Sequence, residues 1–131
     1  MTEEIKKMLD HSVEYATELL METGQSYPFG AYLDRIGVHP LEMEIDEKNV
    51  PQIGKVIEVL TNYCSEELAN EKILGYCLSY EVKVQLDDKT TTDAIAFELH
   101  HKSENDLPKF FLPYKPVGEK QVELGELFAV K

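Results

Sequence analysis

Apolar side chains recur at steps of three and four residues near the start of the chain, the spacing that lines one side of an α-helix. Thr2 can cap the N-terminus of such a helix, and Gly24 can end it in the left-handed conformation. The pattern therefore predicts an amphipathic helix over about residues 3–23. Its apolar stripe consists of Ile5, Met8, Leu9, Ser12, Val13, Ala16, Leu19 and Leu20.

Two alternating runs, residues 29–33 and 41–45, follow this helix and predict a β-hairpin around the turn residues Asp34 to Gly37. Pro40 cannot donate to a strand ladder, so the second strand is expected at a sheet edge. A second helix is then predicted, with Asn49 as its cap and Pro51 in its first turn. Its apolar stripe is Ile53, Val56, Ile57, Leu60, Cys64 and Leu68.

From residue 73 the apolar period changes to two, which indicates β-strands. Residues 73–86 predict one long half-buried strand, and shorter strands are expected over 95–99 and 110–114. Polar turn segments separate the three, so they predict an antiparallel meander. Residues 120–131 are apolar in part and are expected to add a final strand or an arm.

These elements predict a single α+β domain over residues 1–131, of two layers, in the order α-β-β-α-β-β-β. Both helices are expected on one face of an antiparallel sheet of about five strands. This order resembles roadblock and profilin-like modules, a resemblance that implies the strand order 2-1-5-4-3. The segment Tyr27-Pro28-Phe29-Gly30-Ala31 after an acidic helix also resembles a group of small bacterial proteins of unknown function. That resemblance covers about the first third of the chain and implies no catalytic residue.

The chain carries 25 acidic and 13 basic residues, a net charge of −12. This charge repels nucleic acid and anionic lipid, so neither is an expected partner. The charged N-terminus does not fit a secretory signal, so export by that route is not expected, and no apolar run is long enough to cross a bilayer. Two cysteines, Cys64 and Cys77, form no C-x-x-C pair and are expected to be reduced. We therefore expect a soluble cytoplasmic protein.

The acidic residues concentrate in the first part of the chain, where residues 1–72 hold 15 acids and 6 bases. A solvated surface that maintains solubility is the plainer interpretation. The functional interpretation is a surface that attracts and binds a basic protein electrostatically. The leading hypothesis is a non-enzymatic protein-interaction domain, whose sharpest version is an immunity-like inhibitor of a basic toxin. The residues expected to form its surface are Glu14, Glu18, Glu42, Glu44, Asp46 and Glu47.

The alternative hypothesis is a small-molecule-binding protein or enzyme with a pocket between the helices and the sheet. Tyr80, Glu98 and His100 are its candidate pocket residues, because Glu98 and His100 project from the same face of one strand. Two potential ligands do not make a metal site, and no nucleophile stands beside the histidine in sequence. No glycine-rich phosphate loop is present either. We therefore predict no catalytic residue, no metal and no cofactor.

Exposed strand edges favour pairing with another chain unless proline or charge blocks them. Pro40 blocks one edge, and the strand 73–86 is expected to form the other. Leu124, Leu127 and Phe128 in the tail also need burial. These features predict a symmetric homodimer through that strand or the tail.

Overall fold

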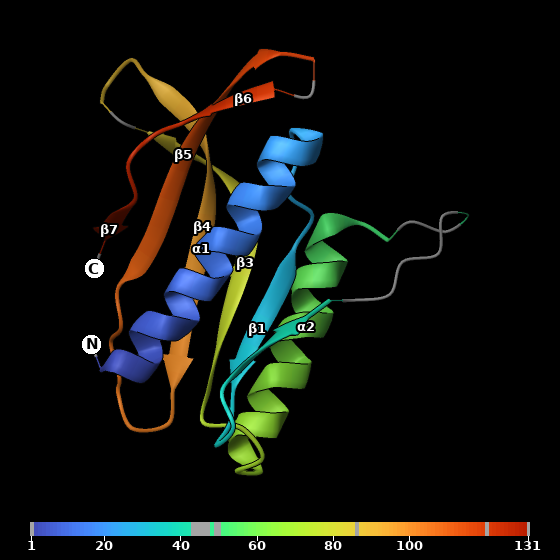
Figure 1. The fold of residues 1–131 in the computed structure, drawn as a ribbon, viewed down its shortest axis with the longest axis vertical. Coiled ribbons are helices and arrows are strands. Elements are labelled where there is room, and N and C mark those ends of the chain that lie inside the picture. Colours follow the sequence, from blue (N-terminus) through green and yellow to red (C-terminus); the bar gives the residue numbers. More distant parts are fainter. Residues whose placement is uncertain (1, 43–47, 49–50, 86, 120, 131) are drawn as a thin grey trace.

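A computed structural model describes residues 2–42, 48, 51–85, 87–119 and 121–130. Two helices and an antiparallel sheet form an α+β fold, as predicted (Figure 1). The elements, in chain order, are α1 (Glu3–Thr23), β1 (Phe29–Leu33), β2 (Val38–Leu41), α2 (Ile53–Ala69), β3 (Gly75–Gln85), β4 (Thr91–His101), β5 (Lys109–Gly118), β6 (Gln121–Leu124) and β7 (Phe128–Val130).

Helix α1 has the predicted bounds for the predicted reasons. The Thr2 hydroxyl accepts a hydrogen bond from the Ile5 amide at 3.4 Å, and Gly24 is left-handed with φ 76°. Helix α2 begins later than expected, since its N-cap is Gln52. The prediction that Pro51 lies in its first turn is therefore wrong. Asn49, the predicted cap, lies outside the described residues.

Among the described residues the strands form a seven-stranded sheet of order β2-β1-β3-β4-β5-β6, with β7 also paired to β5. The hairpin turn and the meander are confirmed, and the tail adds strands rather than an arm. The second hairpin strand is Val38–Leu41 and not residues 41–45 as predicted, and residues 43–45 lie outside the described residues. The order 2-1-5-4-3 that the roadblock resemblance implied is wrong, because β3, not β5, lies beside β1. Consequently β3 is internal, and the prediction that it forms a free edge is also wrong.

The two helices lie on opposite faces of the sheet, which corrects the prediction of one shared face. Successive strand residues point to opposite faces. Cys77 packs in the core cluster that contains the α1 residues, whereas its neighbours Tyr76 and Leu78 pack with α2. In Figure 1, α1 crosses in front of the sheet, while β2 passes in front of α2. The architecture is therefore three layers deep where α2 covers the sheet.

Burial along β3 reflects this arrangement. Residues 75–79 are all buried, so the first half of the strand is covered on both faces rather than half-buried as predicted. Strands buried on both faces carry near-continuous apolar runs. The sequence Gly75-Tyr76-Cys77-Leu78-Ser79 is such a run, apart from its small serine.

On the α2 side, the described part of the chain places no helix over β4 and β5, because α2 contacts mainly β1 and β3. Ala96 is fully buried there between two cross-strand neighbours, Tyr80 and Phe111. Phe128 of β7 stacks on Phe111 with ring centroids 5.4 Å apart. The C-terminal strand therefore extends the sheet beside β5, and its Phe128 side chain packs on the face that the helices leave open.

Candidate functional site

A cavity of about 410 Å³ lies beside the C-terminal half of α1. This volume is within the range of ligand pockets, ~300–1,000 Å³. Most of its lining is apolar, and Glu42 contributes the carboxylate. The lining residues are Leu19, Thr23, Gln25, Tyr27, Pro28, Phe29 and Glu42.

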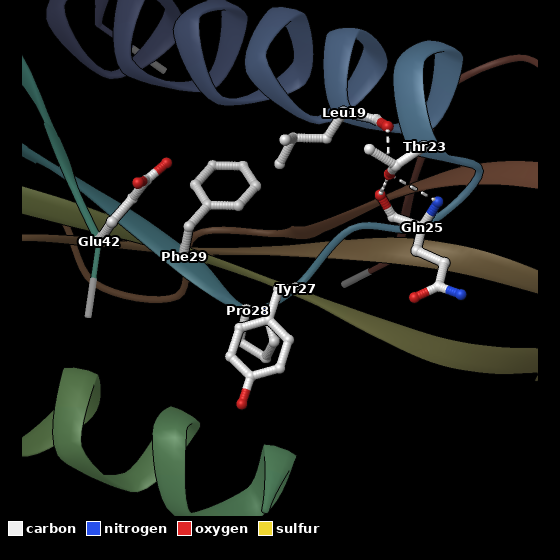
Figure 2. A pocket seen from close by; sticks show the side chains of 7 residues that line it. All are labelled: Leu19, Thr23, Gln25, Tyr27, Pro28, Phe29 and Glu42. Carbon is white, nitrogen blue, oxygen red and sulfur yellow. Dashed lines mark hydrogen bonds between the residues drawn. The ribbon is translucent and has the colours of Figure 1, made fainter. Parts of the chain in front are cut away.

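Figure 2 shows how the sheet positions these side chains. Leu41 of β2 pairs with Gly30 of β1, so the next residue, Glu42, comes beside Phe29. The Glu42 carboxylate and the Phe29 ring point toward α1, whereas the Tyr27 ring points away, toward α2. The Phe29 ring also packs on Tyr15 of α1, with centroids 4.7 Å apart. The Glu42 carboxylate therefore lies next to the Phe29 ring, which packing on Tyr15 holds in place.

Hydrogen bonds fix the segment that connects α1 to β1. The Thr23 hydroxyl lies 2.8 Å from the carbonyl oxygens of Leu19 and Gln25. Farther along, the Tyr27 hydroxyl donates to the Pro51 carbonyl at 2.9 Å, and the Ser26 amide donates to Glu81 at 3.0 Å. The cavity wall is thus held at both ends of the segment and is formed before any ligand arrives.

The predicted acidic surface is only partly described. Glu14 and Glu18 are exposed on α1, and Glu42 lines the cavity. Glu18 and Glu22, four residues apart, lie on one side of the helix and are followed by Leu19 and Thr23, the residues that line the cavity. Glu44, Asp46 and Glu47 lie outside the described residues.

The three predicted pocket residues are brought together on the α2 side of the sheet. The Tyr80 hydroxyl donates to Glu98 Oε2 at 2.9 Å, and His100 Nε2 lies 3.0 Å from Glu98 Oε1. The hydrogen bond from His100, and then that from Tyr80, lower the pKa of Glu98 to about 2 against the opposing effect of burial. Burial, followed by the hydrogen bond to Glu98, raises the pKa of Tyr80. The group therefore presents an ionised carboxylate at neutral pH.

Two residues that the sequence analysis did not single out with this group extend it. Tyr76 stacks on His100 with centroids 4.6 Å apart, and its hydroxyl lies 3.2 Å from Ser65 Oγ on α2. A signal was available for Tyr76, which alternates with Leu78 and Tyr80 on one face of the same strand. No such signal was available for Ser65, because it lies on α2 and meets Tyr76 only through the packing of that helix on β3.

Comparison of the chain with known protein families, with curated proteins and with solved structures finds no match. The structure confirms the order of elements on which the resemblance rested, a helix, a hairpin, a second helix and a sheet, but not the strand order that it implied.

The described residues contain no group of three or more His, Cys, Asp or Glu side chains that could hold a metal ion. No helix among them is long and apolar enough to span a membrane. Cys64 and Cys77 are both free and buried, and desolvation raises their pKa values to about 11 and about 12. Buried thiols of this kind are poor nucleophiles.

Proposed function

We propose that this protein is a non-enzymatic binding domain for a basic protein, and that the cavity beside α1 receives a lysine or arginine side chain of that partner. The observation that carries the proposal is the Glu42 carboxylate, the one acidic group among the described residues of an otherwise largely apolar lining. Long basic side chains have the matching composition, since an apolar stem ends in a cation. An immunity-like inhibitor of a basic toxin is the narrower form of this function.

Charge outside the cavity supports the same partner. Helix α1 carries six acidic residues and two lysines, and the whole chain has a net charge of −12. A field of this sign accelerates encounter with a basic protein and weakens as salt is added. We further propose a cytoplasmic setting, supported by the two free cysteines.

The test uses a defined basic probe and NMR. An acetylated, amidated peptide of alternating glycine and lysine is titrated into the ¹⁵N-labelled protein at low and moderate salt. We expect saturable shifts of the amides of Leu19, Thr23 and Phe29, with weaker binding at higher salt. The same peptide with glutamate in place of lysine should cause no shifts.

Two matched variants separate the site from the overall charge. Glu42→Gln and Glu126→Gln each remove one negative charge, but Glu126 is exposed between β6 and β7, away from the β2 edge. Glu42→Gln should weaken peptide binding about tenfold, the loss expected for a charge-assisted contact. Equal weakening by both variants would show general attraction only and would contradict the proposed site.

Butylamine tests the alternative function, a small-molecule site. It reproduces the end of a lysine side chain without the peptide. If butylamine saturates the same amides as tightly as the peptide, the cavity is a small-amine site and the protein-partner proposal fails. Weak or absent butylamine binding beside tight peptide binding supports the proposal.

A further inference from the structure

Positive side chains gather around a second cavity, of about 380 Å³, at the end of the sheet where β1 turns into β2. They come from three separate segments: the β1–β2 turn, the α2–β3 turn and the residue that follows β4. A cluster of positive side chains is unexpected in a chain in which acidic residues outnumber basic ones 25 to 13. The lining residues are Asp34, Arg35, Ile36, Glu71, Lys72, Leu74 and Lys102.

Backbone hydrogen bonds hold the three segments together. The Leu74 amide donates to the Leu33 carbonyl at 2.7 Å, and the Lys102 amide donates to the Leu74 carbonyl at 3.0 Å. The Asp34 amide donates to the Gly37 carbonyl at 3.0 Å and closes the β1–β2 turn. The positions from which the cations project are therefore fixed in the free protein.

The Asp34 carboxylate in the lining is already engaged. It lies 2.9 Å from His39 Nε2 and accepts hydrogen bonds from the amides of Ile36 and Gly37. The bond to His39 is the main reason that its pKa is lowered. The charge of Asp34 is thus directed into the turn. Glu71 is the other carboxylate among the lining residues.

Within the described part of the chain, two of the three cations in the lining have no ion-pair partner. Lys72 lies 3.9 Å from Glu67, a distance typical of a weak surface pair. Arg35 and Lys102 form no ion pair with any residue that the structure describes. An unpaired arginine presents a fork of donors that matches phosphate or carboxylate oxygens.

Apolar surface adjoins these charges. Ile36 is 89% exposed at the tip of the turn, and Leu74 lies in the same lining. We propose that this cavity binds an anionic ligand, a phosphate or carboxylate carried on a small apolar group. Arg35 and Lys102 hold the anion and Ile36 contacts the apolar part. This site is separate from the one beside α1, so either proposal can fail without the other.

The test titrates phenyl phosphate and, separately, benzoate into the ¹⁵N-labelled protein at constant ionic strength. We expect saturable shifts of the amides of Arg35, Ile36 and Lys102, and the tighter of the two probes identifies the anion class. Arg35→Gln and Lys102→Gln should each weaken binding about tenfold, which corresponds to the loss of a charge-assisted hydrogen bond.

Lys89→Gln is the matched control. It removes the same charge from the β3–β4 turn, at the opposite end of the long strand pair that joins Gly75 to His101. Binding should be unchanged in this variant. Shifts that rise without saturation, or equal weakening by Lys89→Gln, would overturn the proposal, because either result indicates general attraction of anions.

Discussion

Tyr32 of β1 lies directly opposite Tyr76 of β3, and each ring stacks on a histidine of the next strand outward. His39 of β2 stacks on Tyr32 at 5.0 Å, and His100 of β4 stacks on Tyr76 at 4.6 Å. Each histidine also contacts a carboxylate: His39 lies 2.9 Å from Asp34, and His100 lies 3.0 Å from Glu98. A row of four rings therefore crosses four strands on the α2 side, with a carboxylate near each end.

Replacing Glu98 by glutamine should destabilise the protein by about 1–2 kcal/mol. Hydrogen bonds to a charged group contribute ~1.5–3 kcal/mol each, and solvent offsets part of that here because the side chain is 33% exposed. Urea unfolding measures the change. Glu126→Gln, at an exposed position, should change stability by less than ~0.5 kcal/mol. An equal effect of both substitutions would show that the bonds to Tyr80 and His100 contribute nothing.

The same carboxylate predicts a specific acid dependence. Folding lowers the pKa of Glu98 from 4.5 to about 2, so the folded state favours the ionised form. Its contribution is complete above the unfolded pKa and is lost as the pH falls from about 4.5 toward about 2. The stability difference between the wild type and Glu98→Gln should therefore shrink over this range. A difference that stays constant down to about pH 2 would contradict the assigned shift.

Neither cysteine should react in the native protein. Cys64 and Cys77 are fully buried, and desolvation raises their pKa values to about 11 and about 12. They lie on opposite faces of the sheet: Cys64 belongs to α2 and packs in the core on that side, whereas Cys77 of β3 packs in the core that α1 covers. Iodoacetamide at mildly alkaline pH, followed by mass spectrometry, should modify neither thiol until guanidinium unfolds the chain. Rapid modification of either native thiol would contradict its burial.

Two glycines should respond to alanine in opposite directions. A Cβ added at Gly75 would lie 2.6 Å from the His100 carbonyl oxygen, so the paired strands would have to separate locally. Such overpacking costs ~1–3 kcal/mol. Gly54 lies in α2 with nothing within 4 Å of the added atom, so alanine there should stabilise the helix by up to about 1 kcal/mol. Thermal unfolding of both variants measures the contrast, and destabilisation by Gly54→Ala would contradict it.

The homodimer expected from the sequence stays a prediction, with its interface restricted by the sheet order. The strand 73–86 has neighbours on both sides, β1 and β4, so it is not available as an edge. The tail remains as the predicted interface, with Leu127 and Val130 40% and 51% exposed. Light scattering should give twice the monomer mass of 15.0 kDa at micromolar concentrations, and a dimer should be lost when residues 120–131 are deleted. A monomer at all concentrations would contradict the prediction.

The sequence by itself determined the elements whose signals are local. Helix α1 follows from its apolar spacing, Thr2 and Gly24, and the hairpin and meander follow from alternation and turn residues. It also indicated the association of Glu98 with His100, because residues two apart on a strand share a face. All of these depend on neighbours within a few positions along the chain.

Only the tertiary structure decided which face each helix covers and which strand lies beside β1. The period of two shows that Tyr76 and Cys77 point apart, but the crossover through α2 decides which face meets which helix. The same packing assembles both cavities from distant segments: Glu42 and Leu19 line one, and Arg35 and Lys102 line the other. Contacts between segments so far apart depend on the layer arrangement of the whole fold, which no local spacing specifies.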